Sequence, residues 1–196
     1  MKKRHISVLT AILIVVMLFA AFVMTGCEEK IIISEGSNHK VFQISEISGR
    51  DYLYEIYSDS GKLVERDTTF RIEPTITYHD DKLIEIKISV GTGFYYTHFY
   101  DREGDKFSES FDVLRAAAYG KIVYVSPIED RWVLIVRDIF DETEYYKEFY
   151  LDFIKTADPY ATIRLAEFID EQNLRIVYVS GDEYDEIETI LSLNPQ

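Results

Sequence analysis

Short runs in which apolar and polar residues alternate recur along most of this chain, and turn-forming residues separate them. Residues 52–57 (Tyr-Leu-Tyr-Glu-Ile-Tyr) alternate, residues 58–61 (Ser-Asp-Ser-Gly) favour a turn, and alternation resumes at residue 62. A period of two residues is typical of a strand with one buried face, so this segment predicts a β-hairpin. The same pattern returns at residues 82–88 and 94–100, on either side of a Gly-Thr-Gly turn.

The residue composition agrees with strands. The chain has 15 Tyr, 12 Phe and one Trp among its 196 residues, and aromatic side chains favour strands. One cysteine is too few for a disulfide scaffold. We therefore expect an all-β fold, built as an antiparallel meander with at most one short helix.

A five-residue sequence, Ile-Val-Tyr-Val-Ser, occurs at residues 122–126 and again at residues 176–180. Each copy precedes a turn signal and a second alternating run, at residues 132–136 and 187–191. If the repeat is genuine, it predicts stacked blades as in a small or incomplete β-propeller. If the match arose by chance, a two-sheet β-sandwich of short strands is the alternative.

One segment offers a candidate helix. Residues 158–159 (Asp-Pro) would suit its first turn, and Ala161, Leu165 and Phe168 would share one helical face. However, Ala161, Ile163 and Leu165 also alternate as they would in a strand. The sequence leaves both interpretations open.

The N-terminus has the layout of a secretory signal. Lys2-Lys3-Arg4 precede an uncharged apolar run at residues 6–25, which ends at Gly26-Cys27. The apolar run of about 20 residues is also long enough to cross a bilayer as an uncleaved helix. Both interpretations place the folded part outside the cytoplasmic membrane.

The residues Met24-Thr25-Gly26-Cys27 resemble the lipobox of bacterial lipoproteins. The family usually has Leu three residues before the cysteine, where this chain has Met24. The resemblance implies cleavage after Gly26 and a diacylglycerol on the sulfur of Cys27, which anchors the protein to the membrane with two acyl chains. We therefore expect a signal peptide at residues 1–26, a tether at 27–40 and a single extracytoplasmic β domain at 41–196. Within the tether, three isoleucines at residues 31–33 could also pair as an edge strand.

The folded part is similar to strand-rich extracellular proteins of Gram-positive-type bacteria. This similarity involves Val90-Gly91-Thr92-Gly93, Asp138-Ile139-Phe140-Asp141 and Tyr145-Tyr146-Lys147-Glu148. It supports the domain assignment and implies no functional residue.

The chain is acidic, with 35 Asp and Glu against 21 Lys and Arg. Three of the basic residues lie before residue 5, so the folded part is more acidic than the whole. Nucleic acid and anionic lipid headgroups are recognised by positive charge, so we expect neither to bind the folded part directly. Strong mutual repulsion also favours a monomer.

The sequence contains no strong motif of nucleophilic, metal or nucleotide chemistry, such as Gly-x-Ser-x-Gly or His-Glu-x-x-His. His98 lies among aromatic residues and is expected to be a packed, hydrogen-bonded core residue. His79 precedes Asp80-Asp81, where turn formation explains the residues without a metal. Two acidic clusters are interpreted as solvated turns, with a Ca²⁺ site as the alternative. They comprise Asp138, Asp141, Glu142 and Glu144, and then Asp182, Glu183, Asp185, Glu186 and Glu188. We therefore expect no metal, no cofactor and no assignable catalytic residue.

Tyrosines supply the remaining signal. Tyr95-Tyr96, Tyr145-Tyr146 and Tyr150 would place rings on both faces of their strands. We expect one ring of each pair to belong to the core and the other to cover a cross-strand neighbour. The alternative is that exposed rings bind a sugar or a protein. The expected function is a membrane-anchored lipoprotein whose non-enzymatic domain binds an envelope protein or a glycan. The alternative is a small envelope hydrolase that uses a pair of carboxylates. A pocket that converges on two carboxylates would favour the hydrolase, and a patch of exposed aromatic rings would favour binding.

Overall fold

A computed structural model describes residues 29–33, 40–79, 82–154, 159–181 and 184–194. These residues form four small antiparallel sheets, which we name sheets A to D in chain order. Sheet A contains β1 (Glu29–Ile33), β2 (Lys40–Ser48), β3 (Asp51–Tyr57) and β4 (Leu63–Thr69). Sheet B contains β5 (Thr75–His79), β6 (Leu83–Gly91), β7 (Phe94–Asp101), β8 (Lys106–Phe107) and β9 (Phe111–Asp112).

The second half of the chain repeats this organisation. Sheet C contains β10 (Ala116–Ala118), β11 (Lys121–Ile128), β12 (Arg131–Asp138) and β13 (Tyr146–Phe149). Sheet D contains β14 (Ile163–Asp170), β15 (Asn173–Ser180) and β16 (Asp185–Ser192). The short 3-10 helix η1 (Pro159–Thr162) precedes sheet D.

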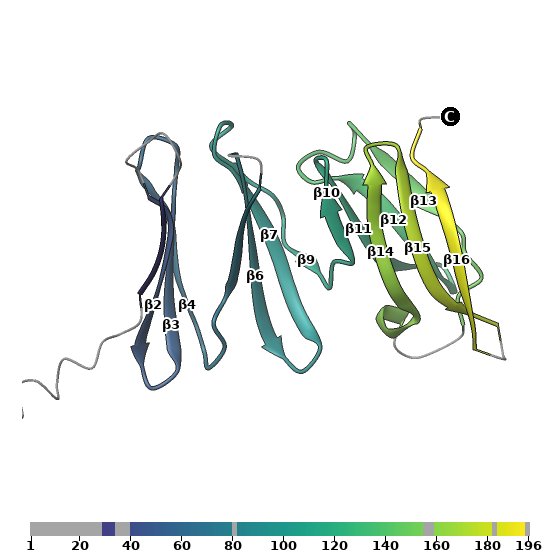
Figure 1. Cartoon of the computed structure of the whole chain (residues 1–196), viewed down its shortest axis with the longest axis horizontal. Helices are drawn as coiled ribbons and strands as arrows, with labels where there is room; N and C mark the ends of the chain where they lie inside the picture. The colour runs from purple at the N-terminus through teal and green to yellow at the C-terminus, as the bar shows by residue number, and fades with distance from the viewer. Residues whose placement is uncertain (1–28, 34–39, 80–81, 155–158, 182–183, 195–196) are drawn as a thin grey trace, which may run out of the picture.

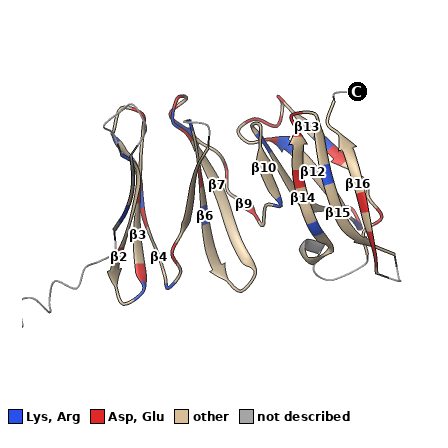
Figure 2. Cartoon of the chain, in the orientation of Figure 1, with Lys and Arg blue, Asp and Glu red and all other residues tan. Residues whose placement is uncertain are grey.

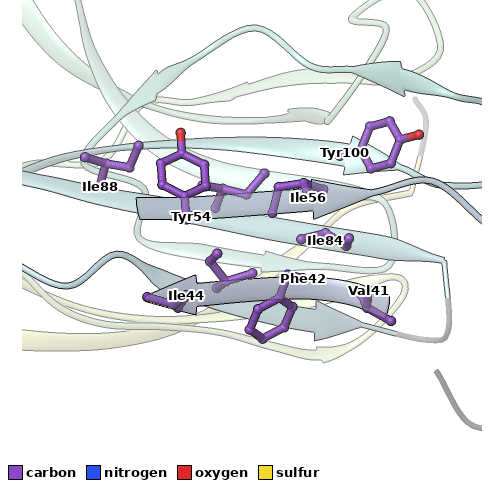
Figure 3. Packing of buried hydrophobic residues seen from close by; sticks show 10 residues of the cluster. Val41, Phe42, Ile44, Tyr54, Ile56, Ile84, Ile88 and Tyr100 are labelled. Atoms are coloured by element: carbon purple, nitrogen blue, oxygen red, sulfur yellow. The ribbon is translucent and has the colours of Figure 1, made fainter. Parts of the chain in front are cut away.

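The four sheets stack face to face in a row that follows the chain, from sheet A to sheet D (Figure 1). Each interlayer has its own apolar core. Between sheets A and B, the buried side chains include Phe42, Ile44, Ile56, Ile84 and Ile88, and Figure 3 shows them packed together. Leu134 and Leu174 are among the residues of the core between sheets C and D. A smaller core between sheets B and C contains Phe99, Phe111 and Ile122.

The two end sheets cover their outer faces with ion pairs. On sheet A, Arg66 contacts Glu55 at 2.6 Å. On sheet D, Arg175 contacts Glu188 at 2.7 Å, and Figure 2 shows charged residues along β14, β15 and β16. A stack of repeated layers ends in layers with a polar outer face, and sheets A and D have this feature.

Within the described residues, the all-β class and the antiparallel meander are confirmed, and the only helix is the single turn η1. Neighbouring sheets pack face to face as in a sandwich, and the described residues form four such sheets in a row. Both copies of Ile-Val-Tyr-Val-Ser occupy equivalent places, since β11 and β15 each lie second in their sheet and pair with the strand that follows.

Two local predictions are refined by the structure. The candidate helix is limited to the single turn η1, and residues 163–170 form strand β14, so the helical interpretation of Leu165 and Phe168 is wrong. Both side chains are partly covered within the sheet, which a period of two allows. In the expected tether, Glu29–Ile33 pair with β2 as the edge strand β1.

Candidate functional site

A groove of about 520 Å³ lies along one edge of sheet C. Its floor and walls come from the start of β12 and from the segment that follows β13. The latter segment is held against sheet D, because Phe153 bridges to Ser180 and the amide of Ile154 donates to the carbonyl of Val179 at 3.1 Å. The groove is lined by Asp130, Arg131, Trp132, Tyr150, Leu151, Asp152, Phe153 and Ile154.

Aromatic rings form much of this groove. Trp132 is half-buried against the core between sheets C and D, while Tyr150 remains exposed. The Arg131 guanidinium lies 4.7 Å from the centroid of the Tyr150 ring. The Phe153 ring meets Tyr178 edge to face, at a centroid distance of 5.3 Å. These contacts hold the rings in place before any ligand arrives.

A second row of side chains continues from the groove along β13. Tyr146 and Tyr150 both donate hydrogen bonds to the carboxylate of Glu148, the former at 3.0 Å. Partial burial, together with this carboxylate, raises the pKa of Tyr146 to about 12. Both phenols therefore stay neutral at physiological pH, and the shared carboxylate fixes their orientation.

Two carboxylates and one guanidinium supply polar groups to the groove. Asp130 and Asp152 line it from opposite segments, and Arg131 lies beside Asp130 in the chain. The hydroxyl of Ser180 contacts Asp152 at 3.4 Å. The groove thus combines flat apolar rings with acceptors and a donor, which is the composition of a site for a polar ligand with apolar faces.

A smaller cavity of about 400 Å³ lies between sheets A and B. Its polar centre is Glu65, which accepts a hydrogen bond from the Tyr54 hydroxyl at 2.9 Å and lies 3.2 Å from Nε2 of His98. Burial, followed by the negative charge of Glu65, raises the pKa of Tyr54 well above its usual range. Asp67 and Tyr96 line the same cavity.

His98 has no ring nitrogen available to a substrate in this cavity. Its Nε2 faces Glu65, and its Nδ1 is buried with no hydrogen-bond partner among the described residues. A general base must reach the proton that it removes. The pairing of His98 with Glu65 instead joins sheet B to sheet A, and the prediction of a packed, hydrogen-bonded histidine is confirmed.

The acidic cluster near residue 140 shapes its own turn. One oxygen of Asp138 accepts the amides of Phe140 and Asp141, at 2.8 and 2.9 Å. Asp141 accepts both the hydroxyl and the amide of Thr143, and these bonds lower the pKa of Asp141. Glu142 lies 3.5 Å from Arg137. Asp138 and Asp141 therefore shape the turn itself, as the turn interpretation predicts, while Glu142 pairs with a strand residue.

The second acidic cluster takes part in ion pairs on sheet D. Glu186 lies 3.6 Å from Arg164, and Glu188 contacts Arg175. Asp182 and Glu183 lie outside the described residues, as does the pair Asp80-Asp81 beside His79. His79 itself contacts Glu85 at 2.9 Å. Within the described part of the chain, no three His, Cys, Asp or Glu side chains come close enough to hold a metal ion.

The predicted division of the tyrosine pairs is confirmed. Tyr95 donates to the carbonyl of Leu114 and Tyr145 to that of Leu193, at 2.5 and 2.8 Å. The next residue of each pair points to the other face: Tyr96 lines the cavity between sheets A and B, and Tyr146 is exposed.

The groove itself was not predicted. The chain's one tryptophan, the second residue of β12, was the available signal, but its partner segment at residues 150–154 shows no strand pattern. Cys27, the expected lipid attachment site, lies outside the described residues. No helix within the described ranges is long and apolar enough to cross a membrane.

No protein-family model matches this chain, and neither the curated proteins nor the solved structures give a significant match. Function is therefore inferred from the chemistry of the residues themselves.

Proposed function

We propose that this chain is a lipid-anchored protein of the bacterial envelope whose stacked-sheet domain binds a glycan in the groove on sheet C. The observation that carries the proposal is the groove's composition. Trp132, Tyr150 and Phe153 are gathered there with Asp130, Asp152 and Arg131.

A sugar ring suits such a groove because its two sides differ chemically. Its C–H faces are apolar and stack on aromatic rings, while its hydroxyls need hydrogen-bond partners when water is displaced. Tyr150 and Trp132 offer the apolar surface, and Asp130 and Asp152 offer acceptors. Because Arg131 and Glu148 already hold Tyr150, little conformational entropy is lost on binding.

Intrinsic fluorescence can test glycan binding directly, since Trp132 is the only tryptophan of the chain. A titration with a soluble N-acetylglucosamine tetramer should change the Trp132 emission with a saturable dependence on concentration. Tyr150→Ala should weaken binding by about tenfold or more, since an aromatic ring that a ligand buries contributes roughly 1.5–3 kcal/mol.

Tyr119→Ala is the matched control. Tyr119 is exposed to a similar extent as Tyr150, but it lies in the β10–β11 turn, outside the groove. The proposal fails if neither this tetramer nor envelope glycan fragments alter the emission. It also fails if Tyr119→Ala weakens binding as much as Tyr150→Ala does.

The lipid anchor is supported by the N-terminal residues that precede the described part of the chain. If the sulfur of Cys27 carries diacylglycerol, Cys27→Ala should leave an unprocessed precursor without the acyl mass. Membrane association cannot decide this, because the uncut apolar run at residues 6–25 would still hold the precursor in the bilayer. Mass spectrometry decides it: a mature chain that begins at lipid-modified Cys27 supports the anchor, and an intact Met1 terminus with a free thiol contradicts it.

One observation favours a second candidate, a hydrolase with a carboxylate pair. Glu65 and Asp67 project from the same face of β4 into the cavity between sheets A and B. Alternate residues of a strand lie about 7 Å apart, within the range that glycosidases use. If this candidate is right, chromogenic glycosides should be cleaved by the wild-type chain, and Glu65→Gln or Asp67→Asn should abolish cleavage. Absence of cleavage by the wild-type chain would leave binding as the function.

A further inference from the structure

Three connections of sheets A and B reach the same end of the stack, the lower end in Figure 1. They are the β2–β3 turn, the β4–β5 connection and the β6–β7 turn. This follows from the meander, because successive antiparallel strands place every second connection at one end. We call these three connections the lower tips.

The lower tips carry large apolar side chains that face solvent. Phe70, Val90 and Phe94 are 69%, 65% and 63% exposed, and Ile47 and Ile72 are exposed as well. All five lie within the three connections or at the strand ends next to them. Isolated exposed apolar residues are ordinary, but a cluster at one end of a domain marks a surface that meets another phase or partner.

The same tips carry two arginines in unusual backbone positions. Arg50 and Arg71 have φ values of 111° and 63°, where glycine or asparagine would cost less. Both side chains are exposed, and the Arg71 guanidinium lies 4.7 Å from the centroid of the Phe70 ring. Cations beside exposed aromatic rings are a combination that suits the boundary between lipid headgroups and acyl chains.

Charge is distributed differently at the opposite end of the stack. The upper turns carry Asp59, Glu103, Asp105, Asp141, Glu142, Glu144 and Glu171. The lower ends of sheets C and D are also acidic, with Glu129, Asp130, Asp152 and Asp185. An anionic membrane would repel these surfaces. At the lower tips of sheets A and B, Arg50 and Arg71 offset Asp51 and Glu73, so this end carries no excess of negative charge and a membrane can approach it.

The direction of β1 brings the proposed anchor to this same end. Glu29, the first residue of β1, pairs with Ser45, three residues before β2 ends at the lower tips. Cys27 precedes Glu29 by two residues, which span at most about 7 Å. Glu29, the first described residue after the proposed lipid site, therefore enters sheet A near its lower end.

We propose that the lower tips of sheets A and B dock on the membrane surface that holds the lipid of Cys27, with Phe70, Val90 and Phe94 in the interface and Arg50 and Arg71 among the headgroups. The proposal rests on the lipid anchor of the proposed function. It revises the expectation that an acidic domain avoids anionic lipid, because local charge at the tips differs from the charge of the whole chain.

A bilayer is favoured over a protein partner by this position. An anchor within two residues of β1 holds the tips at the membrane at all times, so the effective concentration of lipid there is high. Each apolar side chain that enters the interface then adds to the binding provided by the acyl chains.

Tryptophan reporters in the full-length chain test the docking. The protein is reconstituted into vesicles of phosphatidylcholine and phosphatidylglycerol, with and without brominated acyl chains, in a Trp132→Phe background. With Phe94→Trp as the only tryptophan, brominated lipid should quench at least about half of the emission, because the ring lies at the acyl boundary. With Tyr119→Trp, at the opposite end, quenching should stay below about a tenth. Weak quenching at both positions overturns the proposal, and so leaves the tips to a protein partner.

Charge variants test the role of the arginines. Adding Arg50→Glu and Arg71→Glu to the Phe94→Trp chain should reduce quenching, whereas Arg50→Lys and Arg71→Lys should retain it. If the glutamates have no effect, the arginines do not contact headgroups and that part of the proposal is wrong. Arg50 and Arg71 are exposed, so circular dichroism should show an unchanged fold in the glutamate and in the lysine variants.

Mass spectrometry of the same samples separates this proposal from the lipid anchor. A lipidated Cys27 without quenching at position 94 keeps the anchor and refutes docking. An unmodified Cys27 with strong quenching at position 94 refutes the lipid and keeps the docking, since the apolar run at residues 6–25 would hold the same end at the bilayer.

Discussion

The interlayer between sheets A and B and the interlayer between sheets C and D have apolar cores of similar size. The polar contacts that join the two sheets differ. Between A and B, charged side chains cross the gap: Arg102 reaches from sheet B to sheet A, and His98 meets Glu65. Between C and D, Tyr145 and Arg115 donate hydrogen bonds to the backbone carbonyls of Leu193 and Ile163, and no pair like His98–Glu65 joins the described residues of the two sheets.

Arg102 joins sheet B to sheet A through buried hydrogen bonds. Its side chain is 1% exposed and donates to the carbonyls of Tyr57 and Ser58 and to the hydroxyl of Tyr78, at 3.3, 3.2 and 2.7 Å. A buried guanidinium is tolerated only when its N–H groups are matched. These directional bonds fix sheet A against sheet B in one position.

The interlayer between C and D depends more on shape. Its buried side chains are aliphatic and aromatic, with Leu134, Leu174 and Ile176 fully enclosed. Apolar packing is non-directional, so its stability depends on filled volume. We therefore expect the first interlayer to be sensitive to loss of a charge, and the second to loss of volume.

The largest expected effect is that of Arg102→Met, which removes the bonds to the β3–β4 turn and to Tyr78. It should lower the free energy of unfolding by about 3–5 kcal/mol, as measured by urea denaturation. Arg66→Met is the matched control, because that arginine is 60% exposed on the outer face of sheet A. Its loss should cost less than about 1 kcal/mol. If both variants lose the same free energy of unfolding, the buried Arg102 stabilises the protein no more than an exposed arginine does.

Leu174→Ala should cost about 3 kcal/mol, because it leaves a cavity in the core between C and D. Val177→Ala, on the opposite face of the same strand, should cost less than about 1 kcal/mol, since Val177 is only partly covered on the outer side of sheet D. Thermal denaturation of both chains measures the difference. A larger loss for Val177→Ala would mean that the outer face of sheet D is covered in solution.

Glu65→Leu should cost about 2 kcal/mol, because Tyr54 and His98 lose their common partner. Adding His98→Phe should recover part of this loss, since no buried imidazole then needs a partner. The double-mutant cycle, measured by urea denaturation, gives the coupling between the two side chains. Strict additivity of the two substitutions would show that His98 and Glu65 do not interact.

Alkaline pH should weaken the A–B interlayer through Tyr54. Its pKa is raised in the folded chain, so its contribution is complete below pH 10, the pKa of an unfolded tyrosine, and falls as the pH rises further. The loss is at most about 1.4 kcal/mol per pH unit for this one group. Tyr54→Phe should make the stability less dependent on pH above 10. An unchanged pH dependence would place the sensitivity in other tyrosines.

Local alternation in the sequence was enough to predict about half of the strands and their antiparallel meander. The hairpin at residues 52–65, the pair at residues 82–100 and both copies of Ile-Val-Tyr-Val-Ser were recognisable, because a period of two depends only on neighbouring residues. In the ambiguous segment at residues 161–168 the strand interpretation was right from Ile163 on, but Ala161 lies in the 3-10 turn and a register shift places Ile163 and Leu165 on opposite faces of sheet D. The N-terminal signal is likewise a local pattern, and its lipid anchor stays a prediction.

What faces each strand was decided only by the tertiary structure. The valines of the repeated pentapeptide illustrate this: Val123 and Val125 are buried between sheets C and D, whereas Val177 lies on the outer face of the last sheet. The sequence likewise could not show that Arg102 would be buried, that residues 150–154 would complete a groove with Trp132, or that three distant turns would meet at one end. Each of these depends on which sheets stack and in what order, and that order is set by contacts between residues far apart in the chain.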